Sequence, residues 1–521
     1  MRYDVTDKQW WDDAVFYQIY IRSFADASGD GSGDLMGIKS RLPYLKGLGI
    51  DALWITPFYA SPQADGGYDV ADPRTVDPLY GDLAAFDAML AEAKRLGLRV
   101  TVDVVPNHSS DQHEWFQAAL KAAPGSPERD RYIFRDAHDG VLPNNWPAVF
   151  GGPAWERTAD GQVYLHLFAP EQPDINWDNP EAATDLDRTL RFWLDRGVDG
   201  FRIDVAHGMA KPAGLPDLPT LDAAGNVPDG AIDFRWDNDA VHSIHRGIRR
   251  TMDDYPDTVT VGEVWVTDRT RLALYLRPDE LHMSFNFRLA EAAWAPDELR
   301  VAIDESIKTV DGTGTPTCWV LSNHDISRHA TRYGGGKTGR ARARAAALLQ
   351  LALPGTPFIY QGDELGLEDV HVPDDALRDP TWERSGHTER GRDGCRVPIP
   401  WAGSAAPYGF STTSRTWLPM PEGWGQRSVE QQEADPASHL RLYRTALAIR
   451  RSRNAFGDRS LRWLDGPDGL IAFARSDGMV CALNLTGGPV DIPAGTVLLS
   501  STPPQNGKLP NDAAIWVDPG A

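Results

Sequence analysis

The 521-residue sequence is poor in cysteine and in positive charge, and it has no long hydrophobic run. The three cysteines, Cys318, Cys395 and Cys481, are too few and too widely spaced for a disulfide framework or a cysteine-rich metal site. The formal net charge of −22 opposes nucleic acid and anionic membrane as partners, because both bind basic surfaces. We expect a cytoplasmic protein, since the N-terminus has no hydrophobic signal segment and no stretch suffices to span a bilayer.

The sequence also lacks a glycine-rich phosphate turn after its first strand candidate, which argues against a doubly wound nucleotide-binding sheet. It contains instead short β-branched apolar runs that alternate with amphipathic stretches. The expected strands are 14–20, 52–56, 99–105, 200–205, 258–265, 281–287, 317–322 and 357–360. The expected helices include 83–96, 181–196, 237–252, 341–353 and 438–453. This alternation predicts an α/β fold, a (β/α)8 TIM barrel in which function lies at the carboxyl ends of the strands.

Two features divide the chain further. The tryptophan- and proline-rich stretch 107–173 follows the third strand and is too long for an ordinary loop, so we expect an inserted subdomain there. From residue 457 to 521 short strand candidates are separated by glycine and proline, which predicts a C-terminal antiparallel β-sandwich domain. The catalytic barrel then comprises residues 1–106 and 174–456.

Three carboxylates end apolar runs of the predicted barrel: Asp204, Glu263 and Asp325. Asp204 and Glu263 end neighbouring strands, which lie roughly 5 Å apart, close to the spacing that retaining cleavage of a glycosidic bond requires. Arg202 shares a strand face with Asp204 and is expected to keep that carboxylate ionised. The apolar neighbours of Glu263, among them Trp265, are expected to keep it protonated as a general acid.

Two histidines stand beside strand-end carboxylates. His108 ends the third strand and His324 directly precedes Asp325, so both are candidates for binding sugar hydroxyls. A zinc site is the competing interpretation. It is opposed by the absence of two ligands at metal-binding spacing on one element.

The segment from residue 26 to 34 places oxygen-bearing side chains at every second position, with glycines between them. This pattern predicts a structural cation loop, with Ca²⁺ favoured over Mg²⁺ and a solvated turn as the alternative. The segment lacks the late bidentate glutamate of an EF-hand. The predicted ligands are Asp26, Ser28, Asp30, Ser32 and Asp34.

Together these segments resemble the conserved regions of the α-amylase family, glycoside hydrolase family 13. The stretch 103–108 is similar to the first region and 200–204 to the second, while Glu263 and the pair 324–325 are similar to the third and fourth. The resemblance implies that Asp204 is the nucleophile, Glu263 the acid/base and Asp325 the group that holds the 2- and 3-hydroxyls. It also implies that Arg202, His108 and His324 line the subsite of the transferred sugar.

Further segments are similar to the oligo-1,6-glucosidase and α-glucosidase branch of that family. Gln172 opens one such segment, and Tyr68 and Asp69 belong to a motif at the closed end of the pocket, where an aspartate binds the 4-hydroxyl of the terminal glucose and a tyrosine stacks on it. The resemblance makes Phe168 a further aromatic wall and Arg396 the arginine that reaches the pocket from the eighth loop.

The resemblance implies a retaining exo-acting α-glucosidase. The Lys-His pair that serves more distant subsites in endo-acting relatives is missing after Asp204, and Val205 resembles relatives that accept α-1,6 bonds. We expect short α-1,4 substrates such as maltose, α-1,6 activity and some transglucosylation, in a monomer or homodimer without organic cofactor. Trehalose synthase, sucrose isomerase and another α-glucosyl-transferring enzyme are the alternatives. A catalytically dead binding subunit is opposed by the presence of all three acids.

Overall fold

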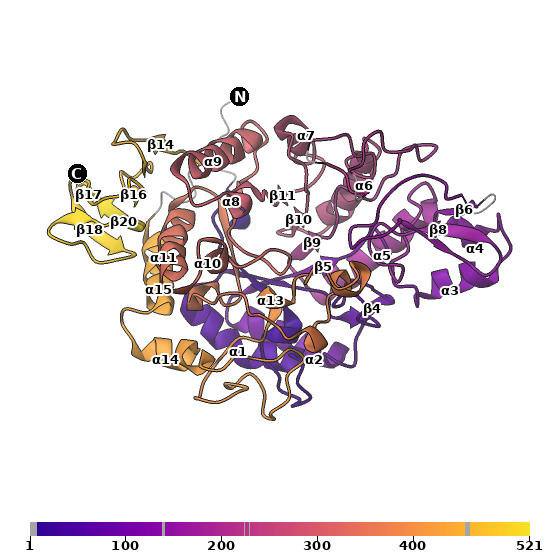
Figure 1. Cartoon of the computed structure of the whole chain (residues 1–521), viewed down its shortest axis with the longest axis horizontal. Helices are drawn as coiled ribbons and strands as arrows, with labels where there is room; N and C mark the ends of the chain where they lie inside the picture. Colours follow the sequence, from indigo (N-terminus) through magenta and orange to yellow (C-terminus); the bar gives the residue numbers. More distant parts are fainter. Residues whose placement is uncertain (1–7, 138–140, 223–224, 229, 454–458, 521) are drawn as a thin grey trace.

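The computed structural model describes residues 8–137, 141–222, 225–228, 230–453 and 459–520. Its centre is one parallel sheet of eight strands, and the chain forms a (β/α)8 barrel (Figure 1). The order in the sheet is β11-β10-β9-β5-β2-β1-β13-β12, so the two end strands are consecutive in the chain. The strands are β1 (Phe16–Ile19), β2 (Ala52–Ile55), β5 (Arg99–Val104), β9 (Gly200–Ile203), β10 (Val259–Gly262), β11 (Met283–Ser284), β12 (Cys318–Val320) and β13 (Thr356–Tyr360).

All eight expected barrel strands are confirmed. Their residues are almost entirely buried, as in a parallel sheet that is covered by helices outside and filled by side chains inside. The helices that follow the strands are α1 (Leu35–Leu48), α2 (Leu83–Arg95), α5 (Pro180–Arg196), α6 (Val241–Asp253), α7 (Arg269–Leu274), α9 (Pro296–Val310), α11 (Gly336–Ala352) and α15 (His439–Ser452).

Helix α5 shows how local sequence sets these elements. The side chain of Asn179 accepts a hydrogen bond from the backbone of Glu181, and Pro180 occupies the first turn, where no backbone donor is needed. Gly197 ends the helix in a left-handed conformation with φ of 94°, which favours glycine. Trp193 on the inner face is fully buried against the barrel.

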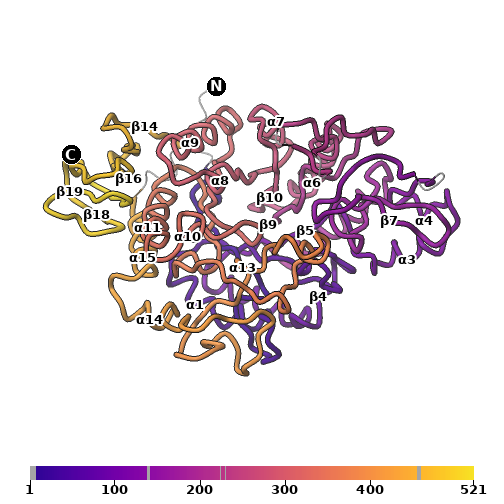
Figure 2. Tube along the Cα trace, viewed as in Figure 1, coloured from indigo at the N-terminus to yellow at the C-terminus, as the bar shows by residue number. Residues whose placement is uncertain are grey.

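A small three-stranded sheet with two helices stands between β5 and β9, at the right in Figures 1 and 2. It comprises α3 (Glu114–Lys121), α4 (Pro127–Asp130), β6 (Phe134–Asp136), β7 (Trp155–Arg157) and β8 (Gln162–Leu165). The chain after β9 packs on this insertion, because Leu215 and Leu218 belong to its hydrophobic cluster. The indole of Trp146 also donates to the carbonyl of Pro216, at 2.8 Å. The insertion between β5 and β9 and the segment after β9, which we call the two excursions, therefore pack together and form one wall above the barrel.

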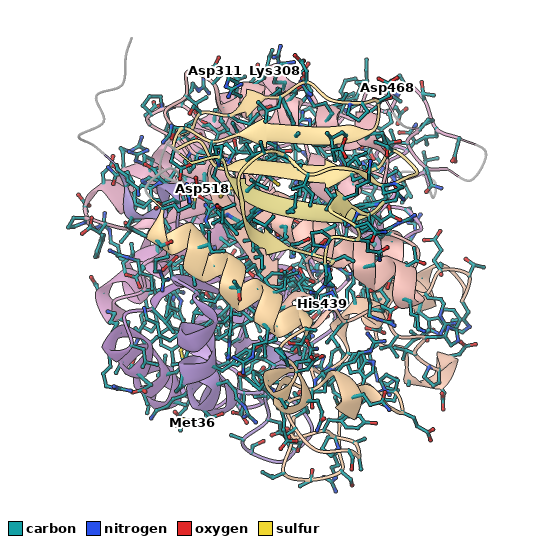
Figure 3. All side chains as sticks on the ribbon, turned by 90° about the vertical axis from the view of Figure 1, so that its left-hand side faces the viewer. Met36, Lys308, Asp311, His439, Asp468 and Asp518 are labelled. Carbon is teal, nitrogen blue, oxygen red and sulfur yellow. The ribbon has the colours of Figure 1, made fainter. Side chains whose placement is uncertain are left out.

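The C-terminal region is antiparallel and lies at the opposite side of the molecule (Figure 1). Its main sheet has the order β14 (Arg462–Trp463), β15 (Leu470–Ala474), β16 (Val480–Asn484), β20 (Ala513–Asp518) and β18 (Thr496–Ser500), and a second pair is β17 (Val490–Asp491) with β19 (Lys508–Leu509). In Figure 3 this sheet faces the viewer, with α15 and its first residue His439 below it. Trp516 anchors the sheet to the barrel through a 3.0 Å bond to the carbonyl of Leu348.

Further short elements lie in the connections: β3 (Tyr59–Ala60), β4 (Asp72–Val76), α8 (Arg288–Glu291), α10 (His329–Arg332), α12 (Pro380–Arg384), α13 (Asp393–Arg396) and α14 (Val429–Ala434). None of the helices in the described part of the chain has the length and apolarity that crossing a bilayer requires.

Candidate active site

A cavity of about 490 Å³ opens at the carboxyl ends of the barrel strands. This volume is in the range of small-molecule sites. The cavity is lined by loops after the strands and by the wall that the two excursions form. The structure brings seven of the predicted site residues into the lining: Tyr68, His108, Phe168, Asp204, Glu263, His324 and Asp325.

Strand register places the two central acids side by side. Gly262 pairs with Ile203 across the β9–β10 ladder, so Glu263 and Asp204 are the next residues on adjacent parallel strands. The backbone N–H of Asp204 donates to Val104 and that of Glu263 to Ile203, each at 2.9 Å. Adjacent strands are about 4.8 Å apart, which matches the roughly 5–5.5 Å between carboxyl groups in retaining glycosidases.

Arg202 joins these acids. Its Nη1 lies 2.5 Å from Asp204 Oδ1 and 2.8 Å from Asp103 Oδ1, and its Nη2 lies 2.9 Å from Glu263 Oε2. The arginine is 2% exposed. One guanidinium charge thus faces three carboxyl groups in a buried place. Full ionisation of all three would leave uncompensated negative charge, which favours retention of a proton within the group.

The pKa of Asp204 shows how burial and the neighbouring charges act together on this carboxyl group. Burial raises this pKa well above its ordinary value, Arg202 opposes the rise, and the charges of Glu263 and Asp103 add to it. Burial also raises the pKa of Asp103 to about 6. The predicted contact between Arg202 and Asp204 is present, but it does not hold the pKa of Asp204 down. The charge of Arg202 is shared among three acids, and burial outweighs it.

The surroundings of Glu263 also differ from the expectation. Besides Arg202, its carboxylate accepts from the Trp265 indole at 3.0 Å and from the Val205 backbone N–H at 3.0 Å. The predicted apolar setting is therefore wrong. Val205 has φ of 44°, an uncommon conformation for a β-branched residue. This backbone turn directs the N–H of Val205 towards the acid.

Asp325 has the opposite charge balance. Burial raises its pKa, but the contact with His324 Nε2, 3.3 Å from Asp325 Oδ2, and the charges of Arg392 and Arg396 more than offset this and hold the pKa below the ordinary range. Arg392 Nη1 and Arg396 Nη2 lie 3.0 and 3.1 Å from Asp325 Oδ1. An ionised carboxylate held in this way is suited to accept hydrogen bonds from hydroxyl groups.

The two predicted histidines are neutral donors or acceptors. Burial lowers the pKa of His108 to about 4 and that of His324 well below its usual value. The ring of Tyr68 stacks on His324 at a centroid distance of 5.2 Å, so both rings form one flat wall of the cavity. Gln172 is fully buried and lies behind the lining, where its amide contacts His108 at 3.0 Å and Asp65 at 3.2 Å. It supports the lining rather than forming it.

Two residues that were predicted to face the cavity do not line it, and in each case a residue nearby in the same loop does. Asp69 does not line the cavity, because its fully buried carboxylate accepts from the backbone N–H groups of Ala64 (2.8 Å) and Asp65 (3.0 Å). Asp69 instead stabilises the turn that presents Asp65 to the cavity. Burial raises the pKa of Asp69 to about 6.

In the eighth loop, which follows β13, the predicted arginine is likewise not the one that lines the cavity. Arg396 contacts Asp325 and the carbonyl of His324, but Arg392 is the arginine in the cavity lining. Arg392 Nη2 lies 2.7 Å from Asp65 Oδ1 and its Nε lies 2.6 Å from Asp379 Oδ2. Both corrections arise because a loop's conformation, not its residue spacing, decides which of two nearby side chains faces a cavity.

Other residues of the lining were not predicted from the sequence: His207, Trp236, Val149, Phe150, Thr381 and Glu389. They come from the inserted subdomain, from the excursion after β9 and from the eighth loop. The tryptophan-rich composition was the one available signal, and it does not indicate which rings reach the cavity.

The predicted cation loop is closed by its own hydrogen bonds. Asp26 accepts from the backbone of Gly29 and Gly31 at 2.6 and 2.8 Å, and Asp34 accepts from Ser28 at 2.9 Å and caps α1. The described residues contain no group of three or more His, Cys, Asp or Glu side chains arranged to hold a metal ion. This also leaves the zinc interpretation without support. Calcium at this loop stays a prediction.

Comparison with known proteins agrees with this geometry. Residues 18–458 match the family model described as alpha amylase, catalytic domain. A probable alpha-glucosidase of Rhizobium meliloti (strain 1021) is 39% identical, with 92% of this chain and 90% of the relative covered. An oligo-1,6-glucosidase of Parageobacillus thermoglucosidasius is 34% identical, with 86% and 84% covered.

Solved structures of the same architecture are also similar. The alpha-glucosyl transfer enzyme XgtA superposes with a TM-score of 0.89 at 36% identity, and the trehalulose synthase MutB from Pseudomonas mesoacidophila MX-45 with 0.87 at 34% identity. Each comparison covers 98% of this chain and 99% of the other. On the family model, the relatives and the converging acids, this chain belongs to the α-amylase family of glycoside hydrolases, in its oligo-1,6-glucosidase and α-glucosidase branch.

Proposed function

We propose that the protein is a retaining exo-α-glucosidase that releases glucose from the non-reducing end of short α-glucosides. Maltose-type α-1,4 bonds are the favoured substrates, with α-1,6 bonds also accepted. The reaction passes through a covalent β-glucosyl intermediate on Asp204. The names of the curated relatives, an alpha-glucosidase and an oligo-1,6-glucosidase, support this class of substrate.

The ion pair between Arg392 and Asp65 carries the proposal. Its 2.7 Å contact joins the loop between β3 and β4 to the loop after β13, and Arg392 also contacts Asp325 at 3.0 Å. Because both residues line the cavity beside the hydroxyl-binding carboxylate Asp325, we infer that their ion pair closes this end and that a glucan chain does not continue past the terminal glucose. Asp65 then accepts a hydrogen bond from the far hydroxyl of that glucose, and cleavage removes one residue at a time.

In the first half of the reaction Asp204 attacks the anomeric carbon, and Glu263 gives its proton to the departing oxygen. Arg202 contacts both carboxyl groups, so it stabilises the negative charge that moves from Asp204 to Glu263 in this step. In the second half Glu263 takes a proton from water, and the water opens the glucosyl ester on Asp204. Two inversions give net retention.

The proposal is tested by following maltose hydrolysis by NMR. The first glucose released from the non-reducing end should be the α-anomer, and Asp204→Asn should lose at least about four orders of magnitude of kcat while its circular dichroism is unchanged. A β-anomeric first product, or full activity of the Asn variant, would refute the mechanism.

A second candidate function is α-glucosyl transfer to another sugar in place of water. The similarity to an alpha-glucosyl transfer enzyme and to a trehalulose synthase favours it. Both functions share the covalent intermediate and differ in what intercepts it. Product analysis on maltose, isomaltose, sucrose and trehalose separates them, because hydrolysis yields free glucose and transfer yields isomers or longer sugars.

A further inference from the structure

The catalytic acid is held by the chain that follows the nucleophile. Two consecutive backbone N–H groups donate to Glu263: that of Val205 to the carboxylate Oε2 and that of Ala206 to the main-chain carbonyl, each at 3.0 Å. These two residues therefore fix both the side chain of the acid and the strand end that carries it. A group that holds them in place acts on the acid without touching it.

The turn at Val205 needs such support. Its φ of 44° lies in the left-handed region, which a β-branched side chain disfavours, so the conformation persists only where its surroundings hold it. One contact is local, since the N–H of Gly208 donates to the carbonyl of Val205 at 2.9 Å. A second contact comes from outside the turn.

This outside contact is made by His245 on α6. Its Nε2 lies 2.8 Å from the carbonyl oxygen of Ala206, and no other donor in the described part of the chain contacts that oxygen. Both residues are fully buried, so the bond is shielded from solvent. Because a carbonyl only accepts, the contact requires a proton on Nε2 of His245.

The surroundings of the ring suit this role. Burial lowers the pKa of His245 to about 4, so the imidazole is neutral and carries a single ring proton. Its Nδ1 is buried without a hydrogen-bond partner among the described residues. A buried nitrogen without a partner costs free energy, which an apolar side chain of the same size would avoid. The bond to Ala206 is the contact that an apolar side chain could not make.

The same layer outside the barrel holds the next residue of the segment. The ring of Tyr275 packs edge-on against His245, with centroids 5.4 Å apart, and its hydroxyl donates to Asp237 at 2.6 Å. The backbone N–H of Asp237 in turn donates to the carbonyl of His207 at 2.8 Å. Two consecutive carbonyls, those of Ala206 and His207, are thus bound from outside the barrel.

We propose that His245 is a positioning residue for the catalytic acid: its N–H holds the carbonyl of Ala206 and thereby keeps the N–H of Val205 directed at Glu263. His245 does not line the cavity and contacts no substrate. The inference rests on the proposed function, in which Glu263 protonates the departing oxygen. Removing the donor of His245 should therefore weaken protonation of the leaving group more than attack by Asp204.

The test compares maltose with α-glucosyl fluoride, because fluoride departs as an anion and needs little help from an acid. His245→Phe keeps a buried aromatic ring and removes the donor. We expect its kcat/KM to fall at least tenfold more on maltose than on the fluoride, since kcat/KM includes the step in which the leaving group departs. His245→Gln, whose amide nitrogen can take the place of Nε2, should restore the wild-type ratio.

His242, one turn earlier on the same helix, supplies the matched control. It is buried, and its Nδ1 contacts Glu280 at 2.8 Å rather than the segment after the nucleophile. His242→Phe should change both substrates by the same factor. The ratio of two kcat/KM values from one preparation does not depend on the folded fraction, so a loss of stability does not imitate the effect. His245→Met gives the same comparison if the Phe variant does not fold.

Equal losses on maltose and fluoride when the donor is removed, or a ratio that His245→Gln does not restore, would overturn the positioning role alone. Wild-type enzyme that is inert on both substrates would overturn the proposed function, and the positioning role with it.

Discussion

The pair Asp65 and Asp69 offers the sharpest test of the site, because two aspartates four residues apart have different roles in the structure. Asp65 lines the cavity and contacts Arg392 at 2.7 Å, whereas Asp69 is fully buried and holds two backbone N–H groups. We expect Asp65→Asn to impair catalysis and Asp69→Asn to impair stability.

The magnitudes follow from the contacts. A hydrogen bond to a charged group contributes about 1.5–3 kcal/mol, so loss of the Asp65 charge should lower kcat/KM for maltose roughly 10- to 150-fold. An asparagine at position 69 has a single acceptor oxygen, so the N–H of Ala64 or Asp65 is left without a partner. This should reduce the free energy of unfolding by about 1–3 kcal/mol.

Steady-state kinetics on maltose and denaturant unfolding, measured on both variants, separate the two effects. The reasoning would be refuted if Asp69→Asn lowered kcat/KM as much as Asp65→Asn at an unchanged unfolding midpoint. Activity of Asp65→Asn equal to that of the wild type would refute the role of the Arg392–Asp65 bridge in closing the pocket.

Three further predictions concern other parts of the molecule. Because Asp204 must be ionised to attack and its pKa is raised, kcat/KM should fall as pH decreases through that pKa. Asp103→Asn removes a neighbouring charge that raises the pKa of Asp204, so it should move the acid side of the pH–rate profile to lower pH. An unmoved profile would contradict the sharing of Arg202 among the three acids. Gly208→Ala should displace Trp236 from its place in the cavity lining and lower kcat/KM for maltose; an unchanged kcat/KM would contradict the packing argument. If the loop 26–34 binds calcium as the sequence predicts, millimolar Ca²⁺ should raise the thermal midpoint above that in EDTA, and Asp30→Ala should abolish the difference. Identical midpoints would refute a cation there.

The barrel and its catalytic acids could be predicted because local sequence determines them. The strands are continuous buried runs, and each carboxylate directly follows one of these runs, so the geometry of a parallel barrel brings Asp204, Glu263 and Asp325 to one edge. No further information about distant contacts is needed once the strands are aligned. The same reasoning gave Arg202, which shares the strand of Asp204.

The loop residues could not be predicted in this way. Asp69 and Arg396 were placed in the pocket by motif, but the turn after β3 presents Asp65, and the eighth loop presents Arg392. A loop has no fixed period, so its residue spacing does not indicate which side chain faces inwards. The hydrogen bonds and ion pairs of the folded loop decide this.

By itself, the sequence determined the architecture, the order of the strands and the three acids at their ends, because each depends on short-range pattern alone. Only the tertiary structure decided the limits of the pocket. The Arg392–Asp65 bridge joins residues 327 positions apart, and the wall with Trp236 and His207 forms where the excursion after β9 packs on the inserted subdomain. Such contacts arise from the packing of remote segments, and no local pattern encodes them.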